Sequence, residues 1–221
     1  VLIGDANKVK SEAYFRALGR YVQSLNGRYI TAEDVNTSTR DMSYVAMETS
    51  HVVGLEGKSG NPSPITALGV FNAVKAGLKH KFGSAEVENR TFAVQGAGQT
   101  GYYLIGYLLE AGAKKVYFTE INPRHIERMK QEHPEVEFVK PEDIFSQDVD
   151  VLSPCALGGA LNDKTIPHIK APVVCGSANN VLLDEERDGK ALKERGIVYC
   201  PDFVANAGGI INVYHELHGY V

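Results

Sequence analysis

The chain has 221 residues, enough for one large domain or for one and a half. Hydrophobic residues make up 43% and charged residues 23%, which allows a packed core in a soluble protein. The net charge of −4 provides no basic field for nucleic acid or a membrane surface, and no apolar run is long enough to cross a membrane. The three cysteines form no C-x-x-C pair, which favours a reducing, cytoplasmic location.

The first third of the chain predicts mainly helices. Apolar residues recur at helical spacing from residue 9 to Gly27, which ends that helix. RYITAEDV at 28–35 indicates a strand, and TSTRDM begins a helix in 37–52. The breaker-rich KSGNPSP leads into a further helix at 64–82, with Ser63 as its expected cap.

From residue 91 onward, strands and helices alternate. This order predicts an α/β fold with a Rossmann-type, doubly wound, mostly parallel sheet, because parallel strands need crossover connections. The expected strands are 91–95, 115–120, 137–139, 149–154, 171–178 and 196–202, and the expected helices are 99–111, 123–132 and 184–194. The chain also ends in a segment, HELHGYV, that reads as helical.

The segment VQGAGQTG lies directly between the first of these strands and an amphipathic helix. Its glycines have the G-x-G-x-x-G spacing of a dinucleotide-binding turn. In such a turn Gly96 permits the tight bend, Gly98 lets the backbone approach a pyrophosphate, and Gly101 lets helix and strand pack closely. The pyrophosphate is expected at the helix N-terminus, where free N–H groups favour negative charge.

Glu120 ends the second strand, 22 residues after Gly98. A carboxylate there accepts hydrogen bonds from the adenosine ribose and repels a 2′-phosphate, so NAD is favoured over NADP. Arg124 argues against this preference, because its positive charge would pair with the 2′-phosphate of NADP.

Small residues and asparagines follow the later strands, in SPCALGG, GSANN and PDFVANAGG. Ligands of open α/β sheets lie at the carboxyl ends of the strands, so these loops predict the rest of a cleft. Upstream, Asp34 ends the segment RYITAED and is a candidate general acid or base, whereas Glu33 would point to the opposite face. The histidines have no metal-ligand spacing, so no metal site is expected.

Together these segments resemble the glutamate/leucine/phenylalanine/valine dehydrogenases, and the leucine-type members most. The resemblance is carried across the whole chain by GRYITAEDVNT, GNPSPITALGV, VQGAGQTG, SPCALGGALND, GSANN and PDFVANAGGIINV. It implies NAD-dependent oxidative deamination of an L-amino acid to a 2-oxo acid and ammonium.

The resemblance also implies roles for individual residues. Asp34 matches the family's proton-transferring acid/base, Thr66 contacts the nicotinamide end, and Asn206 binds the substrate carboxylate or amine. The expected cofactor-binding residues are Thr66, Gly96, Gly98, Gln99, Thr100, Gly101, Glu120, Ile121, Cys155, Ala156, Leu157, Ala178 and Asn179.

The expected substrate pocket is apolar. By resemblance it includes Ala32, Ile210 and Val213, besides Asn206. A glutamate side chain would leave its carboxylate unpaired there, so a branched-chain aliphatic amino acid is expected. Leucine, valine and isoleucine differ by about a methylene, worth only ~1–3 kcal/mol, and all three stay open.

In the family that the chain resembles, two working lysines lie in an upstream segment, one of them in a glycine-rich GGGK-type motif, and no such motif occurs here. The chain therefore looks truncated and is expected to bind NAD but to turn over little or nothing alone. Residues 1–57 are expected to be the C-terminal part of a substrate and oligomerisation domain, and 58–221 the NAD-binding domain, with helix 64–82 as the link. The full-length protein is expected to be a homo-oligomer.

Other functions fit parts of the pattern. A non-catalytic NAD-binding or regulatory module would lack the lysines naturally, and a phenylalanine- or glutamate-type dehydrogenase would share the motifs. A 2-hydroxy-acid dehydrogenase would need a histidine acid/base facing the cleft, and none is found at a strand end.

Overall fold

The computed structural model describes residues 2–34 and 36–219. The chain divides into two compact units, Val1–Pro62 together with Gly209–Val221, and Ser63–Gly208. None of the helices in the described part is long and apolar enough to span a membrane.

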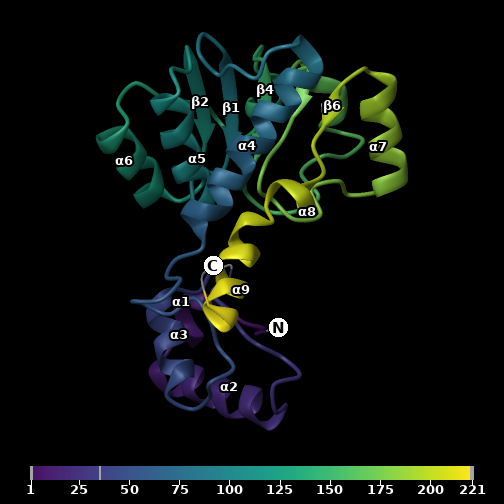
Figure 1. The fold of residues 1–221 in the computed structure, drawn as a ribbon. Helices are drawn as coiled ribbons and strands as arrows, with labels where there is room; N and C mark the ends of the chain where they lie inside the picture. The colour runs from purple at the N-terminus through teal and green to yellow at the C-terminus, as the bar shows by residue number, and fades with distance from the viewer. Residues whose placement is uncertain (1, 35, 220–221) are drawn as a thin grey trace. The chain divides into compact units, whose positions relative to one another are not determined.

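The larger unit is built on a six-stranded parallel sheet in the order β3-β2-β1-β4-β5-β6 (Figure 1). The chain starts in the middle, runs outward to β3, then returns to β4 on the other side of β1. This reversal of strand order is the topological switch point at which doubly wound sheets bind their ligands. The strands are β1 (Thr91–Gln95), β2 (Lys115–Thr119), β3 (Glu137–Phe138), β4 (Val151–Pro154), β5 (Val173–Val174) and β6 (Val198–Tyr199).

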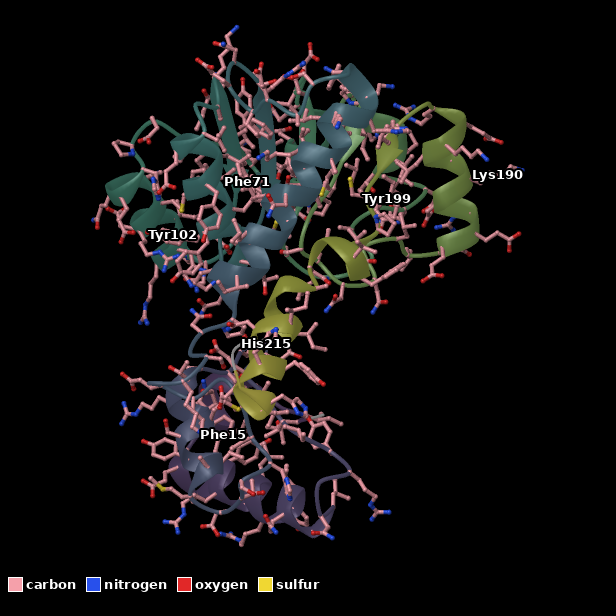
Figure 2. All side chains as sticks on the ribbon, viewed as in Figure 1. Phe15, Phe71, Tyr102, Lys190, Tyr199 and His215 are labelled. Carbon is pink, nitrogen blue, oxygen red and sulfur yellow. The ribbon has the colours of Figure 1, made fainter. Side chains whose placement is uncertain are left out.

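Side chains alternate between the two faces of this sheet. Phe92 and Val94 of β1 lie in one apolar core, and Ala93 lies in the other. The first core lies under α4 (Ser63–Phe82), α5 (Gln99–Glu110) and α6 (Pro123–Glu132), and Figure 2 shows Phe71 on α4. The second lies under two 3-10 turns, η1 (Ile144–Ser146) and η2 (Ile166–His168), and α7 (Glu185–Glu194), whose Lys190 points outward.

The helices begin where their caps predict. Asn122 caps α6 by accepting from the Arg124 N–H, with Pro123 in the first turn, and Asp184 caps α7 by accepting from the Arg187 N–H. Strands β5 and β6 are shorter than the expected 171–178 and 196–202, because their ladder pairs only two residues of each strand. The residues that follow leave the sheet and form loops at its carboxyl edge. The short helix α8 (Asp202–Ala205) follows β6.

The smaller unit contains α1 (Ala6–Val9), α2 (Glu12–Ser24), α3 (Thr39–Ala46) and the last helix, α9 (Gly208–His218), from Gly209 onward. Ser11 and Ser38 cap α2 and α3 with their hydroxyl groups. Phe15, Met42, Val45 and Val52 form its buried core, and Phe15 is labelled in Figure 2.

Two expectations differ from the structure here. The strand expected at 28–35 does not form, since within 28–34 the only pairing is a single bridge between Thr31 and Val52; residue 35 lies outside the described residues. The boundary expected between residues 57 and 58 also differs, because the structure divides the chain after Pro62 and assigns the C-terminal residues from Gly209 to the smaller unit. The Glu216 carboxylate of α9 accepts hydrogen bonds from the Gly54 and Ser59 N–H groups at 2.9 and 3.2 Å, which joins the C-terminal helix to the N-terminal segment.

Candidate nucleotide-binding site

The glycine-rich turn, the Glu120 corner and the loop after β4 emerge from adjacent strands. Gln95 at the end of β1 is in register with Thr119 of β2 and with Pro154 of β4. All carboxyl ends of a parallel sheet lie at one edge, so the segments that follow these residues share that edge. The structure therefore brings together most of the cofactor-binding residues expected from the sequence.

Two of the three motif glycines are required by the protein's own packing. Gly96 has a positive φ of 90°, and a Cβ there would lie 3.0 Å from the Ala156 Cβ. A Cβ on Gly101 would lie 1.9 Å from the Gly96 carbonyl oxygen, which no rearrangement of a side chain could relieve. These two positions let α5 begin directly against β1.

Gly98 is different, because a Cβ there would meet no protein atom within 4 Å. It is the N-cap of α5, and because glycine has no side chain, no side-chain cap covers the first N–H groups of this 12-residue helix, at Gln99 and Thr100. The open side of the turn thus combines accessible backbone donors with the positive end of a helix dipole. The space into which a Cβ would point is open, as an anion bound at a helix N-terminus requires.

The Glu120 carboxylate lies against this turn. One oxygen accepts from the Ala97 N–H at 3.0 Å, and the other accepts from the Ile121 and Asn122 N–H groups at 2.8 and 3.0 Å. His125 Nδ1 lies 3.6 Å from the first oxygen. Backbone donors on two segments therefore hold this carboxylate in place at the end of β2. Arg124 donates its backbone N–H to Asn122 and is exposed.

The loops after β4 and β5 pack on each other with little space. A Cβ on Gly176 would lie 2.0 Å from the Pro154 carbonyl oxygen, and one on Gly158 would lie 2.7 Å from the Asn179 carbonyl oxygen. The Ala178 N–H donates to the Pro154 carbonyl oxygen at 3.1 Å. Burial raises the pKa of the Cys155 thiol, whose neighbour is Ser177, so this thiol stays protonated at neutral pH.

Asn179 and Asn206, expected from two different loops, meet directly. The Asn206 side-chain amide donates to the Asn179 side-chain oxygen at 2.5 Å and to the Ser177 carbonyl oxygen at 3.2 Å. The first turn of α4 lies close to the same loop. A Cβ on Gly208, two residues after Asn206, would lie 3.4 Å from the Thr66 Cα. Thr66, Asn179 and Asn206 therefore lie around one end of the sheet's carboxyl edge.

Two apolar side chains expected to bind the cofactor lie open to solvent. Ile121 is 84% exposed and Leu157 is 69% exposed, although both follow buried strands.

The smaller unit holds the remaining expected residues. Asp34 begins a turn closed by Thr37, whose N–H and hydroxyl both donate to the Asp34 carbonyl oxygen. Ala32 and Val213 are half-buried, and Ile210 on α9 is 70% exposed. Burial, followed by the negative charge of Asp41, raises the pKa of the neighbouring Glu33 carboxyl.

Three buried polar atoms at the strand ends escaped the sequence reasoning. Gln95 Oε1, Thr119 Oγ1 and Ser153 Oγ have no hydrogen-bond partner in the described part of the chain. Unpaired buried groups are rare and call for an explanation such as a bound water or ligand. The signal available in the sequence was a polar residue at the last or the second-last position of each of three strands.

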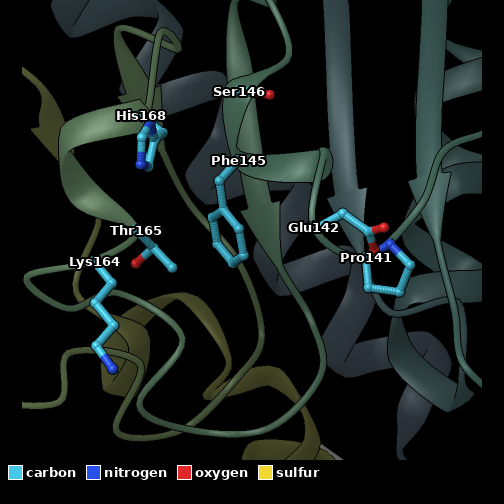
Figure 3. Close-up of a pocket in the computed structure, with 7 residues that line it drawn as sticks. All are labelled: Pro141, Glu142, Phe145, Ser146, Lys164, Thr165 and His168. Atoms are coloured by element: carbon cyan, nitrogen blue, oxygen red, sulfur yellow. The ribbon is translucent and has the colours of Figure 1, made fainter.

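A separate hollow of about 330 Å³ lies between the two 3-10 turns and contains none of the expected site residues (Figure 3). It is lined by Pro141, Glu142, Phe145, Ser146, Lys164, Thr165 and His168. Among residues 2–34 and 36–219, no group of three or more histidine, cysteine or acidic side chains is placed to hold a metal ion.

A parallel sheet of this order, with a glycine-rich turn and an acid at the next strand end, defines the class of Rossmann-type nucleotide-binding folds. Residues 115–219 match the sequence profile of the glutamate/leucine/phenylalanine/valine dehydrogenases, and residues 1–51 match the dimerisation domain of the same family. The chain belongs to the Glu/Leu/Phe/Val dehydrogenase family.

Individual relatives agree with this assignment. The chain is 52% identical to a leucine dehydrogenase of Thermoactinomyces intermedius, over 100% of this chain and 60% of that protein. The crystal structure of L-tryptophan dehydrogenase from Nostoc punctiforme is similar with a TM-score of 0.76 at 41% identity, over 99% of this chain and 62% of that one. A hetero-hexameric glutamate dehydrogenase from Thermus thermophilus shares the fold, with a TM-score of 0.78 at 20% identity, over 98% and 59%. The chain thus spans about three fifths of the length of its relatives.

Proposed function

We propose that the protein catalyses the NAD-dependent oxidative deamination of a branched-chain aliphatic L-amino acid, giving the 2-oxo acid and ammonium. The observation that carries the proposal is the open face of the turn at Gly98 beside the fixed carboxylate of Glu120. Membership in the amino-acid dehydrogenase family supports oxidative deamination as the reaction, and 52% identity to a leucine dehydrogenase supports the substrate class.

The residues of the larger unit fit NAD. The N–H groups at the start of α5 would hold the pyrophosphate, and Glu120 would accept hydrogen bonds from the ribose hydroxyls. Glu120 already accepts from three backbone N–H groups, so a 2′-phosphate would face a carboxylate that cannot turn away. This favours NAD over NADP.

The other expected residues supply orientation and proton transfer. NAD, when bound, would accept the hydride from the substrate Cα. Asn206 and Asn179 offer amide donors and acceptors that can orient a carboxylate or amine. We assign the acid/base role to Asp34, and substrate side-chain binding to Ala32, Ile210 and Val213, whose apolar surfaces suit an aliphatic group.

The same proposal assigns a role to each of the two units. We assign the smaller unit to substrate binding and assembly, because residues 1–51 match a dimerisation domain, and the larger unit to the cofactor. The protein would be a cytoplasmic homo-oligomer.

The test is a calorimetric titration of the purified chain with NAD and with NADP. We expect NAD to bind more tightly, and Glu120→Gln to weaken NAD binding and reduce the preference, because its amide presents N–H to Ala97. Tighter binding of NADP, or no binding of either, would contradict the cofactor assignment. A panel of leucine, valine, isoleucine, phenylalanine and glutamate then tests the substrate class, with activity expected in the full-length protein and little in the 221-residue chain.

A further inference from the structure

Cys175 and Cys200 directly follow two neighbouring strands. Strand β5 pairs Val174 with Tyr199 of β6, so the next pair along this register is Cys175 with Cys200. The Cys200 N–H donates to the Val174 carbonyl oxygen at 2.9 Å, which continues the ladder to this point. Adjacent strands lie ~4.8 Å apart. Disulfides join residues whose Cα atoms are about 4.4–6.8 Å apart, so this spacing suits one.

Both thiols point to the same helix. The Cys175 Sγ lies 3.8 Å from the Val70 carbonyl oxygen, and the Cys200 Sγ lies 3.6 Å from the Ala73 carbonyl oxygen. These carbonyl groups are three residues apart on α4 and therefore on one face of that helix. Each thiol is also close enough to the other to shift its pKa. The sulfur atoms thus share one small space between the sheet and α4.

The two thiols differ in exposure and acidity. Cys175 is fully buried, whereas Cys200 is half-buried and lines a narrow crevice with Tyr199 and Asp202. The neighbouring Cys175 thiol lowers the pKa of Cys200, whereas the Cys200 thiol together with burial raises the pKa of Cys175. Cys200 is the more reactive sulfur, because the thiolate is the nucleophile.

We propose that Cys175 and Cys200 form a redox site that a hydroperoxide converts to a disulfide between β5 and β6. The Cys200 thiolate attacks one peroxide oxygen, the O–O bond breaks, and Cys200 becomes a sulfenic acid while the other oxygen leaves as water after taking a proton. The Cys175 sulfur then attacks the Cys200 sulfur, the S–O bond breaks, and a second water leaves with the Cys175 proton. Two thiols and one hydrogen peroxide give one disulfide and two waters.

The site lies beneath the loops of the candidate nucleotide-binding edge. Gly176 to Asn179 follow Cys175, and Asp202 to Asn206 follow Cys200, and the two loops meet in the Asn179–Asn206 hydrogen bond. Formation of a disulfide shortens the separation of the two sulfur atoms and shifts these loops. If the proposed function holds, oxidation lowers NAD affinity, at least about fivefold.

The test uses the three tryptic peptides that separate the cysteines: 131–164 with Cys155, 171–187 with Cys175, and the peptide from Gly196 with Cys200. The native protein is treated with hydrogen peroxide, alkylated and mapped by mass spectrometry. We expect the Cys175 and Cys200 peptides to be joined, Cys155 to be alkylated, and dithiothreitol to reverse the link. Free, alkylated Cys175 beside an oxidised or unreacted Cys200 would overturn the proposal.

Variants separate the two steps. Cys175→Ser should leave a sulfenic acid on Cys200 that dimedone traps, and Cys200→Ser should abolish the reaction. Equal NAD affinity in reduced and oxidised protein would overturn the coupling to the loops. Failure to bind NAD in either form would instead contradict the proposed function and leave the thiol assignment standing.

Discussion

The three glycines of the turn occupy different surroundings although they share one motif. Gly101 is enclosed by the Gly96 carbonyl group and the Cys155 Cβ, while Gly98 faces open space. The motif therefore combines positions that serve packing with one that serves a ligand, and a matched pair of substitutions separates them.

We expect Gly101→Ala to destabilise the larger unit by several kcal/mol, because overpacking against backbone costs about 1–3 kcal/mol even where side chains can move. Gly98→Ala should change stability by within about 1 kcal/mol and weaken NAD binding at least tenfold. Chemical denaturation and calorimetry measure both effects. Equal loss of stability in the two variants would contradict the separation.

Glu33 predicts a dependence of stability on pH. Its pKa is raised from the ordinary 4.5 by burial and by Asp41, and Glu33 Oε2 has no hydrogen-bond partner among the described residues. A raised pKa means that the folded state binds the proton more tightly than the unfolded state, so the contribution is favourable at low pH and is lost as pH rises past 4.5 and through the folded pKa. We expect Glu33→Gln to raise the Tm at pH 7 and to leave it unchanged at pH 4. A gain of equal size at both pH values would rule out titration as the cause.

At the scale of elements, two side chains of helix α9, Glu216 and Asn212, bind the loop at 54–59. Glu216 is 3% exposed at its side chain, and its oxygen accepts from the Gly54 and Ser59 N–H groups and from the Ser59 hydroxyl. Asn212, one turn earlier, donates to the Ser59 carbonyl oxygen at 3.2 Å. The last helix therefore closes the loop at 54–59.

We expect Glu216→Ala to cost about 2–3 kcal/mol, since it leaves buried N–H groups unpaired, and Ser59→Ala to cost about 1 kcal/mol. Hydrogen exchange at 54–59 should accelerate in Glu216→Ala while exchange in β1 stays unchanged. Uniform acceleration across both units would show that they unfold together and would contradict this local role.

At the scale of the whole molecule, the larger unit is closed on itself. Its two ends meet, because a Cβ on Gly208 would lie 2.4 Å from the Ile65 carbonyl oxygen. Both apolar cores of the sheet are formed by residues within 63–208. A domain with adjacent ends and its own core can fold alone.

We therefore expect residues 63–208, expressed alone, to fold cooperatively and to bind NAD within about threefold of the affinity of the 221-residue chain. Circular dichroism and calorimetry provide the measurements. A piece that folds but binds NAD tenfold more weakly would show that the smaller unit contributes to the cofactor site.

The sequence alone determined the parallel α/β class, the glycine-rich turn and the family. These depend on short-range information: the helical period of 99–110, the apolar residues 92–94 in the middle of β1, and glycines at fixed spacing before a helix. The same local reasoning predicted a strand at 28–35, and it was wrong over 28–34 because a strand needs a partner that no local pattern can supply.

Only the tertiary structure decided which distant residues meet. It joined α9 to the loop at 54–59, set Asn206 against Asn179, and placed Cys175 beside Cys200. Each pair is separated by more than twenty residues, so its contact depends on strand order and chain return, which spacing along the chain does not encode. The open space at Gly98 is of the same kind, because what surrounds a residue is a property of the folded chain.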